Sequence, residues 1–208
     1  MRVTKLAPAL AKLVSDVRAD HVMMRRYHAT YNARMDGKAP VLRDLVEKIG
    51  FQVVAAYRVM RFFNDVDAGL AARVVSRVIR HAYGSDIHWD ADFAPGVMVV
   101  HGMGMAISHA ARVHEGALLF QHCTLGEGRN AETGEVGAPT VERDAVIGAG
   151  ATLVGPITIG ARSKIMPGCV VVQSVPPDSI VESPTPNVRP RVASSNGVRD
   201  ANDARGGA

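Results

Sequence analysis

The stretch 146-VIGAGATLVGPITIGARSKIMPGCVV-171 carries an aliphatic side chain at every sixth position. The members of this row are Ile147, Leu153, Ile159, Ile165 and Val171, with Val141 one step before them. Two rows with the same period precede it, namely Ile107, Val113, Leu119 and Leu125, and Ile87, Phe93 and Val99. A fixed period of six residues is typical of a parallel β-helix, in which stacked coils bury such rows together. The sequence therefore predicts a parallel β-helix.

The period is interrupted at two places. From Val99 to Ile107 the step is eight residues, so two extra residues follow directly after His101. From Leu125 to Val141 the step is sixteen, so a polar, glycine-rich segment leaves the coil as an inserted loop over residues 126–140. Insertions in solenoid proteins cluster on one face, which is often the binding face. Both interruptions therefore indicate a functional site.

Residues 1–85 have the spacing of amphipathic helices instead. In the segment 69–83, Leu70, Val74 and Val78 lie on one helical face and arginines lie on the other, and Gly84 is a typical helix end. We expect an α-helical domain over 1–85, a β-helix domain over 86–188 and a disordered tail over 189–208. The tail is expected to be disordered because it has almost no large apolar residues. The predicted fold class is α+β.

The composition argues against several partners. The formal net charge is +4, but the arginines are scattered along the chain, which does not indicate a nucleic-acid-binding surface. No apolar run approaches the roughly 20 residues of a membrane span, and Lys12 and Asp16 break the N-terminal apolar stretch. Cys123 and Cys169 form no CxxC pair and are expected to be reduced and buried. The sequence thus predicts a cytoplasmic protein without nucleic-acid or membrane partners.

His101 follows a strand-like apolar run and precedes Gly102 and Gly104. An imidazole that titrates near neutral pH can act as a general base. A partly buried histidine in a turn is the other interpretation that the residues themselves allow.

The chain resembles the serine acetyltransferases of the hexapeptide-repeat superfamily over roughly residues 40–188. The resemblance lies in FQVVAAYRVMRFF (51–63), DIHWDADFAPGVMVVHGMG (86–104), LLFQHCTLGEG (118–128) and the repeat region from residue 146 to 188. It implies a left-handed β-helix and homotrimers. Membership of this family also implies that two trimers often pair through their helical domains.

The resemblance further implies the chemistry of the site. The histidine matching His101 takes the proton of the acceptor hydroxyl, which then attacks the thioester carbonyl of acetyl-CoA, and the aspartate matching Asp86 orients that histidine. A hydroxyl is a poor nucleophile until a base takes its proton, and a carboxylate fixes the imidazole tautomer. For the acetyl-CoA co-substrate, the resemblance carries to Gly126, Ala149 and Lys164. The two small residues let the pantetheine arm lie against the backbone between neighbouring subunits, and the lysine meets a phosphate.

The residues that hold the acceptor in the family are not all present. The family usually has an aspartate where this chain has Val100, and an Arg-His-Pro-Lys stretch where this chain has residues 137–140, with Ala138 in place of the histidine. A zwitterion bound without such partners leaves charges unpaired, which is costly. Asp36 lies near the position of a further acceptor-binding aspartate of the family.

Two acceptors therefore remain open. The acceptor is either L-serine, held by other residues such as Arg129, Glu127 or Arg34, or a different hydroxyl compound such as a sugar or an intermediate of a specialised pathway.

Two other function classes are weighed against acyl transfer. A zinc enzyme similar to the γ-class carbonic anhydrases would use three histidines, for which His109, His114 and His122 are the candidates. The residues that accompany such a site are not found at convincing spacing, so no metal is expected. A non-catalytic scaffold is the second alternative. Because the chain ends in ARGGA and not in the isoleucine that docks into a partner sulfhydrylase, we expect no complex with cysteine synthase.

Overall fold

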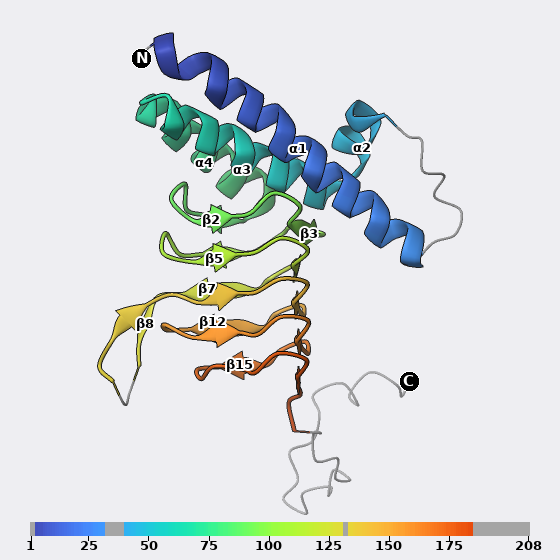
Figure 1. Cartoon of the computed structure of the whole chain (residues 1–208), viewed down its shortest axis with the longest axis vertical. Coiled ribbons are helices and arrows are strands. Elements are labelled where there is room, and N and C mark those ends of the chain that lie inside the picture. Colours follow the sequence, from blue (N-terminus) through green and yellow to red (C-terminus); the bar gives the residue numbers. More distant parts are fainter. Residues whose placement is uncertain (1–2, 32–39, 131–132, 185–208) are drawn as a thin grey trace, which may run out of the picture.

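The computed structural model describes residues 3–31, 40–130 and 133–184, and Figure 1 shows helices stacked on one end of a column of strands. Arg34, Asp36 and the predicted tail (189–208) lie outside the described residues. The helices are α1 (Val3–Tyr31), α2 (Val41–Glu47), α3 (Ile49–Asp65) and α4 (Gly69–Tyr83). α4 ends at Gly84, which has a φ of 64° and is therefore in the left-handed region, as expected for a helix-ending glycine. None of these described helices is long and apolar enough to cross a bilayer.

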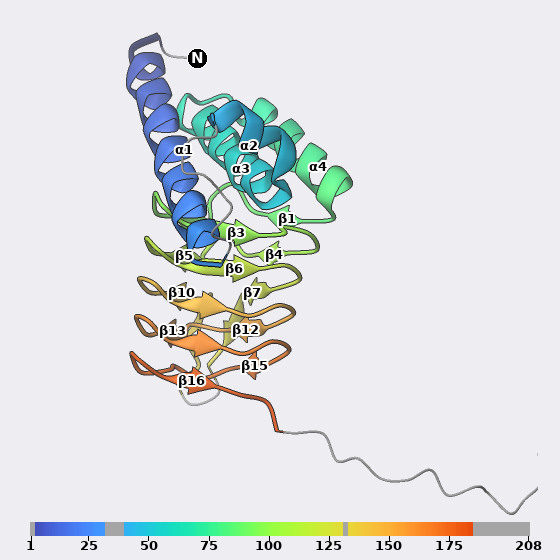
Figure 2. The ribbon, with the colours of Figure 1, turned by 90° about the vertical axis from the view of Figure 1, so that its right-hand side faces the viewer.

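The strands form three parallel sheets around a common axis, and five coils stack along this axis (Figure 2). Sheet A contains β1 (Asp86–Ile87), β4 (Ala106–Ile107), β7 (Thr124–Gly126), β12 (Thr152–Val154) and β15 (Val170–Val171). Sheet B contains β2 (Asp92–Phe93), β5 (Arg112–Val113), β10 (Thr140–Val141) and β13 (Thr158–Ile159). Sheet C contains β3 (Met98–Val100), β6 (Leu118–Phe120), β11 (Val146–Ile147), β14 (Lys164–Ile165) and β16 (Ile180–Val181).

The three predicted rows of apolar residues line the inside of this column. In sheet A, Ile87 pairs with Ile107, Ile107 with Leu125, and Leu125 with Leu153. Sheets B and C stack their apolar residues in the same way, and every residue of the three rows is at most 4% exposed. The predicted α+β fold class with a parallel β-helix is confirmed.

The two corners on either side of sheet C contain residues with a left-handed backbone conformation. At the corner between sheets B and C, each coil has one residue with a φ between 58° and 80°, in the left-handed region that glycine adopts most easily. These residues are Gly96, Gly116, Asp144, Arg162 and Asp178. The corner between sheets C and A also contains left-handed residues, and His101 is one of them, with a φ of 65°.

The inserted loop leaves the β-helix between β7 and β10. It forms a two-stranded antiparallel hairpin from β8 (Gly128–Arg129) and β9 (Val136–Gly137), which projects from the column in Figure 1. The sixteen-residue step therefore corresponds to a hairpin outside the coil.

The helices are joined to the first coil by close packing and by a buried ion pair. Because a Cβ atom at Gly50 of α3 would lie 2.0 Å from the carbonyl oxygen of Val99, only glycine permits this approach of α3 to β3. The guanidinium of Arg58 donates to the Asp20 carboxylate at 2.8 and 3.0 Å and to the carbonyl oxygens of Phe93 and Ala94 at 2.6 and 2.7 Å. α1, α3 and the first coil thus meet at one buried charged group.

Candidate active site

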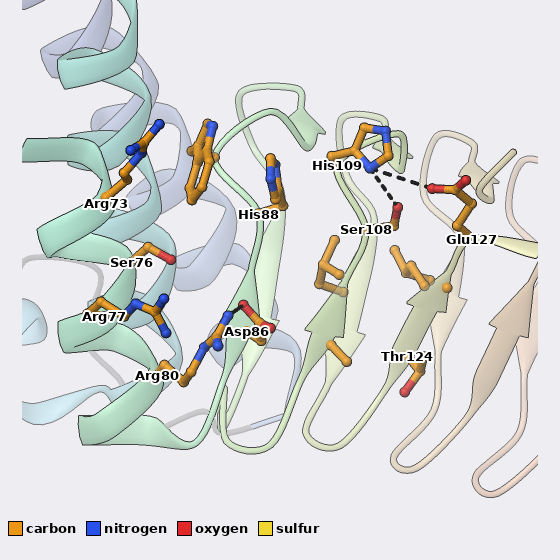
Figure 3. A pocket seen from close by; sticks show the side chains of 15 residues that line it. Arg73, Ser76, Arg77, Arg80, Asp86, His88, Ser108, His109, Thr124 and Glu127 are labelled. Carbon is orange, nitrogen blue, oxygen red and sulfur yellow. Dashed lines mark hydrogen bonds and ion pairs between the residues drawn. The ribbon is translucent and has the colours of Figure 1, made fainter. Parts of the chain in front are cut away.

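Asp86 lies in a cavity of about 660 Å³ between α4 and the outer face of sheet A (Figure 3). Its carboxylate forms an ion pair with Arg80 of α4 and is half exposed. Gly126, at the end of β7, lines the same cavity. On the far side, the rings of His88 and Trp89 pack with their centroids 4.1 Å apart. This cavity therefore holds one predicted catalytic residue and one predicted co-substrate residue.

His101 lies in a second cavity, of about 250 Å³, between the helices and β3. Its imidazole is exposed, at the corner that follows β3. The walls come from α1, from the junction of α2 and α3, and from β3, where Val100 is 7% exposed. Val100, which the resemblance places at the position of an acceptor-binding aspartate, is thus a buried apolar side chain beside the histidine.

The segments that carry Asp86 and His101 are neighbours at the corner between sheets C and A. Ser85 donates from its hydroxyl to the carbonyl oxygen of Gly102 at 2.7 Å, which joins the two segments directly. The two side chains nevertheless line different cavities, and among the described residues no hydrogen bond or ion pair connects them. The pairing of Asp86 with His101 stays a prediction.

The three predicted co-substrate residues lie on different parts of the chain's surface. Gly126 is on sheet A, whereas Ala149 is at the corner between sheets C and A, where its carbonyl oxygen accepts a hydrogen bond from the Gly168 amide. Lys164 is exposed on β14 of sheet C. One chain does not bring these residues together, and their role stays a prediction.

The predicted acceptor residues in and near the inserted hairpin lie away from His101 in the chain. Ala138 is partly buried between β9 and β10 and packs against the core. Arg129 of β8 donates to the carbonyl oxygen of Gly134 at 3.0 Å, so its guanidinium is engaged within the hairpin. Asp36 lies outside the described residues.

The three histidines considered for zinc are at three different corners of the β-helix. His109 follows β4, His114 follows β5 and His122 follows β6. Among the residues that the structure describes, no three histidine, cysteine, aspartate or glutamate side chains come close enough together to hold a metal ion. The ring of His122 packs instead against Gly104, where a Cβ atom would lie 2.1 Å from its Nδ1.

Sequence reasoning missed two basic residues beside His101, namely His28 of α1 and Lys48 between α2 and α3. Burial lowers the pKa of the His28 imidazole, and the nearby positive charge of Lys48 lowers it further. Neither residue belongs to a motif. Only the packing of α1 and α3 against β3 reveals them.

Comparison with known proteins identifies the family. No protein-family model matches the chain. The serine acetyltransferase of Bacillus licheniformis is 34% identical over 146 residues, which are 68% of this chain and 67% of that protein. The chain belongs to the serine acetyltransferase family. The serine acetyltransferase of Synechococcus elongatus is 34% identical over 150 residues, which are 72% of this chain but only 59% of that relative. The chain thus spans less than two thirds of some relatives.

Solved structures of the family show the same fold. The serine acetyltransferase of Neisseria gonorrhoeae in complex with serine has a TM-score of 0.70 at 24% identity, over 86% of this chain and 77% of that one. A serine acetyltransferase in complex with CoA has a TM-score of 0.68 at 22% identity, over 82% of this chain and 66% of that one. The column of strands is therefore the left-handed β-helix of these enzymes.

Proposed function

We propose that this protein is an acetyl-CoA-dependent O-acetyltransferase that acts on L-serine or a related small hydroxyl compound. The observation that carries the proposal is the position of His101, whose exposed imidazole lines a cavity of about 250 Å³ in a member of the serine acetyltransferase family. The relatives are named for serine acetylation, and solved relatives bind serine or CoA.

In the proposed reaction, His101 takes the proton from the acceptor hydroxyl as the oxygen attacks the thioester carbonyl carbon of acetyl-CoA. The C–S bond then breaks, and the imidazolium returns its proton to the departing CoA thiolate. The products are the acetyl ester and free CoA. Asp86 would stabilise the imidazolium once its carboxylate reaches the imidazole, which requires that it leave Arg80 or that His101 come from a neighbouring subunit.

The proposed binding groove for acetyl-CoA lies between neighbouring subunits of a trimer. This arrangement is supported by the positions of Gly126 and Lys164 on two different sheets, since faces of two chains would have to combine to enclose one ligand. With L-serine as the acceptor, the product is O-acetylserine, which places the enzyme in cysteine biosynthesis in the cytoplasm.

A second candidate is O-acetylation of another hydroxyl compound by the same base. The buried Val100 beside His101 favours it, because an apolar side chain cannot pair with the ammonium group of serine.

The test is the release of free CoA thiol from acetyl-CoA in the presence of L-serine, amino sugars or sugars. We expect His101→Ala to lower kcat/KM about 10²- to 10⁴-fold, the usual contribution of a general base. His114→Ala, which changes another exposed histidine, is the matched control and should keep the parent rate. Near-normal turnover in His101→Ala would contradict the proposed base. The scaffold alternative requires that the protein neither binds nor consumes acetyl-CoA.

A further inference from the structure

The cavity beside His101 has a positive charge that no group of the described chain neutralises. It is lined by His28 from α1, by Glu47, Lys48 and Ile49 at the junction of α2 and α3, and by β3. Its volume of about 250 Å³ corresponds to about eight water molecules at liquid density. It therefore fits a compound with only a few non-hydrogen atoms.

Two acidic groups of the described chain lie near this cavity, and both are already paired. Glu47 accepts a hydrogen bond from Arg43 at 2.9 Å. Asp44, which is buried behind the cavity, lies 2.8 Å from the His21 ring nitrogen and accepts from Arg25 at 3.0 Å. These pairs neutralise the carboxylates, so they would not repel an anion in the cavity.

Lys48 carries the unpaired positive charge of the cavity. Its ammonium makes no hydrogen bond or ion pair with any residue that the structure describes, and the side chain is only partly exposed. His28 lies close enough for the charges of Lys48 and His101 to act on it. Lys48 also directly precedes α3, and the N-terminal end of a helix carries a partial positive charge. An anionic group placed here would meet the only unpaired full charge among the cavity-lining residues of the described chain.

Among the described residues, Glu47 is the only acidic group that lines the cavity, and Arg43 already pairs with it. Met98, Val99 and Val100 of β3 are buried and apolar, and Phe51 of α3 is 2% exposed. An ammonium group among these side chains would lose its hydration without gaining a partner.

We infer that Lys48 binds the carboxylate of the acceptor, and that the cavity selects small hydroxy acids by this group without requiring an amino group. This inference rests on the proposed function, in which His101 activates the acceptor hydroxyl. Lys48 and His101 line the same cavity, so an acid held by its carboxylate at Lys48 would have its hydroxyl in the cavity that contains the imidazole.

Three acceptors that differ by one group test the inference. L-Serine has both charged groups, 3-hydroxypropanoate lacks the ammonium, and ethanolamine lacks the carboxylate. We expect 3-hydroxypropanoate to be acetylated with a kcat/KM within about threefold of that for L-serine, and ethanolamine at least tenfold more slowly. An ethanolamine rate equal to that of serine would overturn the inference, as would a strict requirement for the ammonium.

Variants of Lys48 assign the effect to this side chain. Lys48→Met keeps the aliphatic length and removes the charge, so KM for both carboxylate acceptors should rise at least tenfold while KM for acetyl-CoA stays unchanged. Lys48→Arg should restore most of the affinity. Lys5→Met removes an exposed lysine that pairs with Asp67, and is the matched control. An unchanged acceptor KM in Lys48→Met would refute the assignment.

Calorimetric titration of L-serine and 3-hydroxypropanoate, without acetyl-CoA, separates this inference from the proposed function. Suppose that the parent protein binds the carboxylate compounds, that Lys48→Met does not, and that the parent releases no CoA thiol with any acceptor. This result would support the binding site at Lys48 and refute the proposed transferase activity. The absence of binding to the parent protein would overturn the inference even if transfer to another acceptor is detected.

Discussion

The lower coils of the β-helix and its upper end, where the helices join it, are held together in different ways. In the lower coils, from Val141 to Val171, each coil buries the same kind of aliphatic residue in the same place, and no charged side chain is buried. At the upper end the same apolar rows continue, but a buried guanidinium, a close helix–strand contact and two extra residues are added. Both cavities that contain the predicted catalytic residues are at this upper end. The regular part provides the fold, and the irregular part provides the candidate site.

Removing the buried charge at the upper end is the strongest test of whether the two regions are stabilised in different ways. Arg58→Met leaves the Asp20 carboxylate buried without its guanidinium partner. We therefore expect the free energy of unfolding to fall by about 3–5 kcal/mol. Hydrogen exchange should show lost protection in α1 and the first coil, with little change in the lower coils. Urea denaturation gives the free energy of unfolding. Arg143→Met is the control, because Arg143 pairs with Glu115 at the surface over 3.4 Å. Equal effects of the two variants would contradict the assigned role of Arg58.

Removing a large aliphatic side chain is the corresponding test of the lower coils. Leu153 is fully buried between Leu125 and Val171, so Leu153→Ala should destabilise the protein by about 2–5 kcal/mol. Because each coil contacts only its neighbours, protection should be lost in β7, β12 and β15 and retained in α1. Val172→Ala, at a side chain that is 65% exposed in the next coil, is the control. A loss of protection that spreads equally over helices and coils would show that the two regions do not unfold separately.

The difference between the regular lower coils and the irregular upper end also explains which parts of the structure could be predicted from the sequence. The rows of apolar residues identify the β-helix because burial recurs at every sixth residue, once on each of the three sides of a coil, and the breaks after His101 and Leu125 identify the altered corner and the inserted hairpin. The position of Lys48 has no such signal. It depends on α3 approaching β3 at Gly50, a contact between segments that are far apart in sequence.

The relation between Asp86 and His101 shows the same limit. Stacking of coils brings their segments together through Ser85 and Gly102. Which cavity each side chain enters depends on the corner between them and on Arg80 of α4, and periodicity carries no information about either.

The smallest effect is expected at an exposed corner of the lower coils. Arg162 donates from its guanidinium to both carboxylate oxygens of Asp178 one coil further on, and both side chains are largely exposed. This contact holds the pKa of the Asp178 carboxyl below its usual value. A carboxyl with a lowered pKa in the folded state stabilises the protein above its unfolded pKa, and this contribution is lost as the pH falls through the folded pKa.

Arg162→Met should therefore lower the melting temperature slightly at pH 7, by much less than Arg58→Met or Leu153→Ala, because solvent screens an exposed ion pair. The difference between variant and parent should disappear in acid, once Asp178 is protonated in both proteins. Thermal melts at a series of pH values and at low and high salt measure this difference, and high salt should reduce it at pH 7. A large loss of stability that persists in acid would mean that Arg162 supports the corner through packing and its left-handed backbone, and that the lower coils also depend on residues outside the apolar rows.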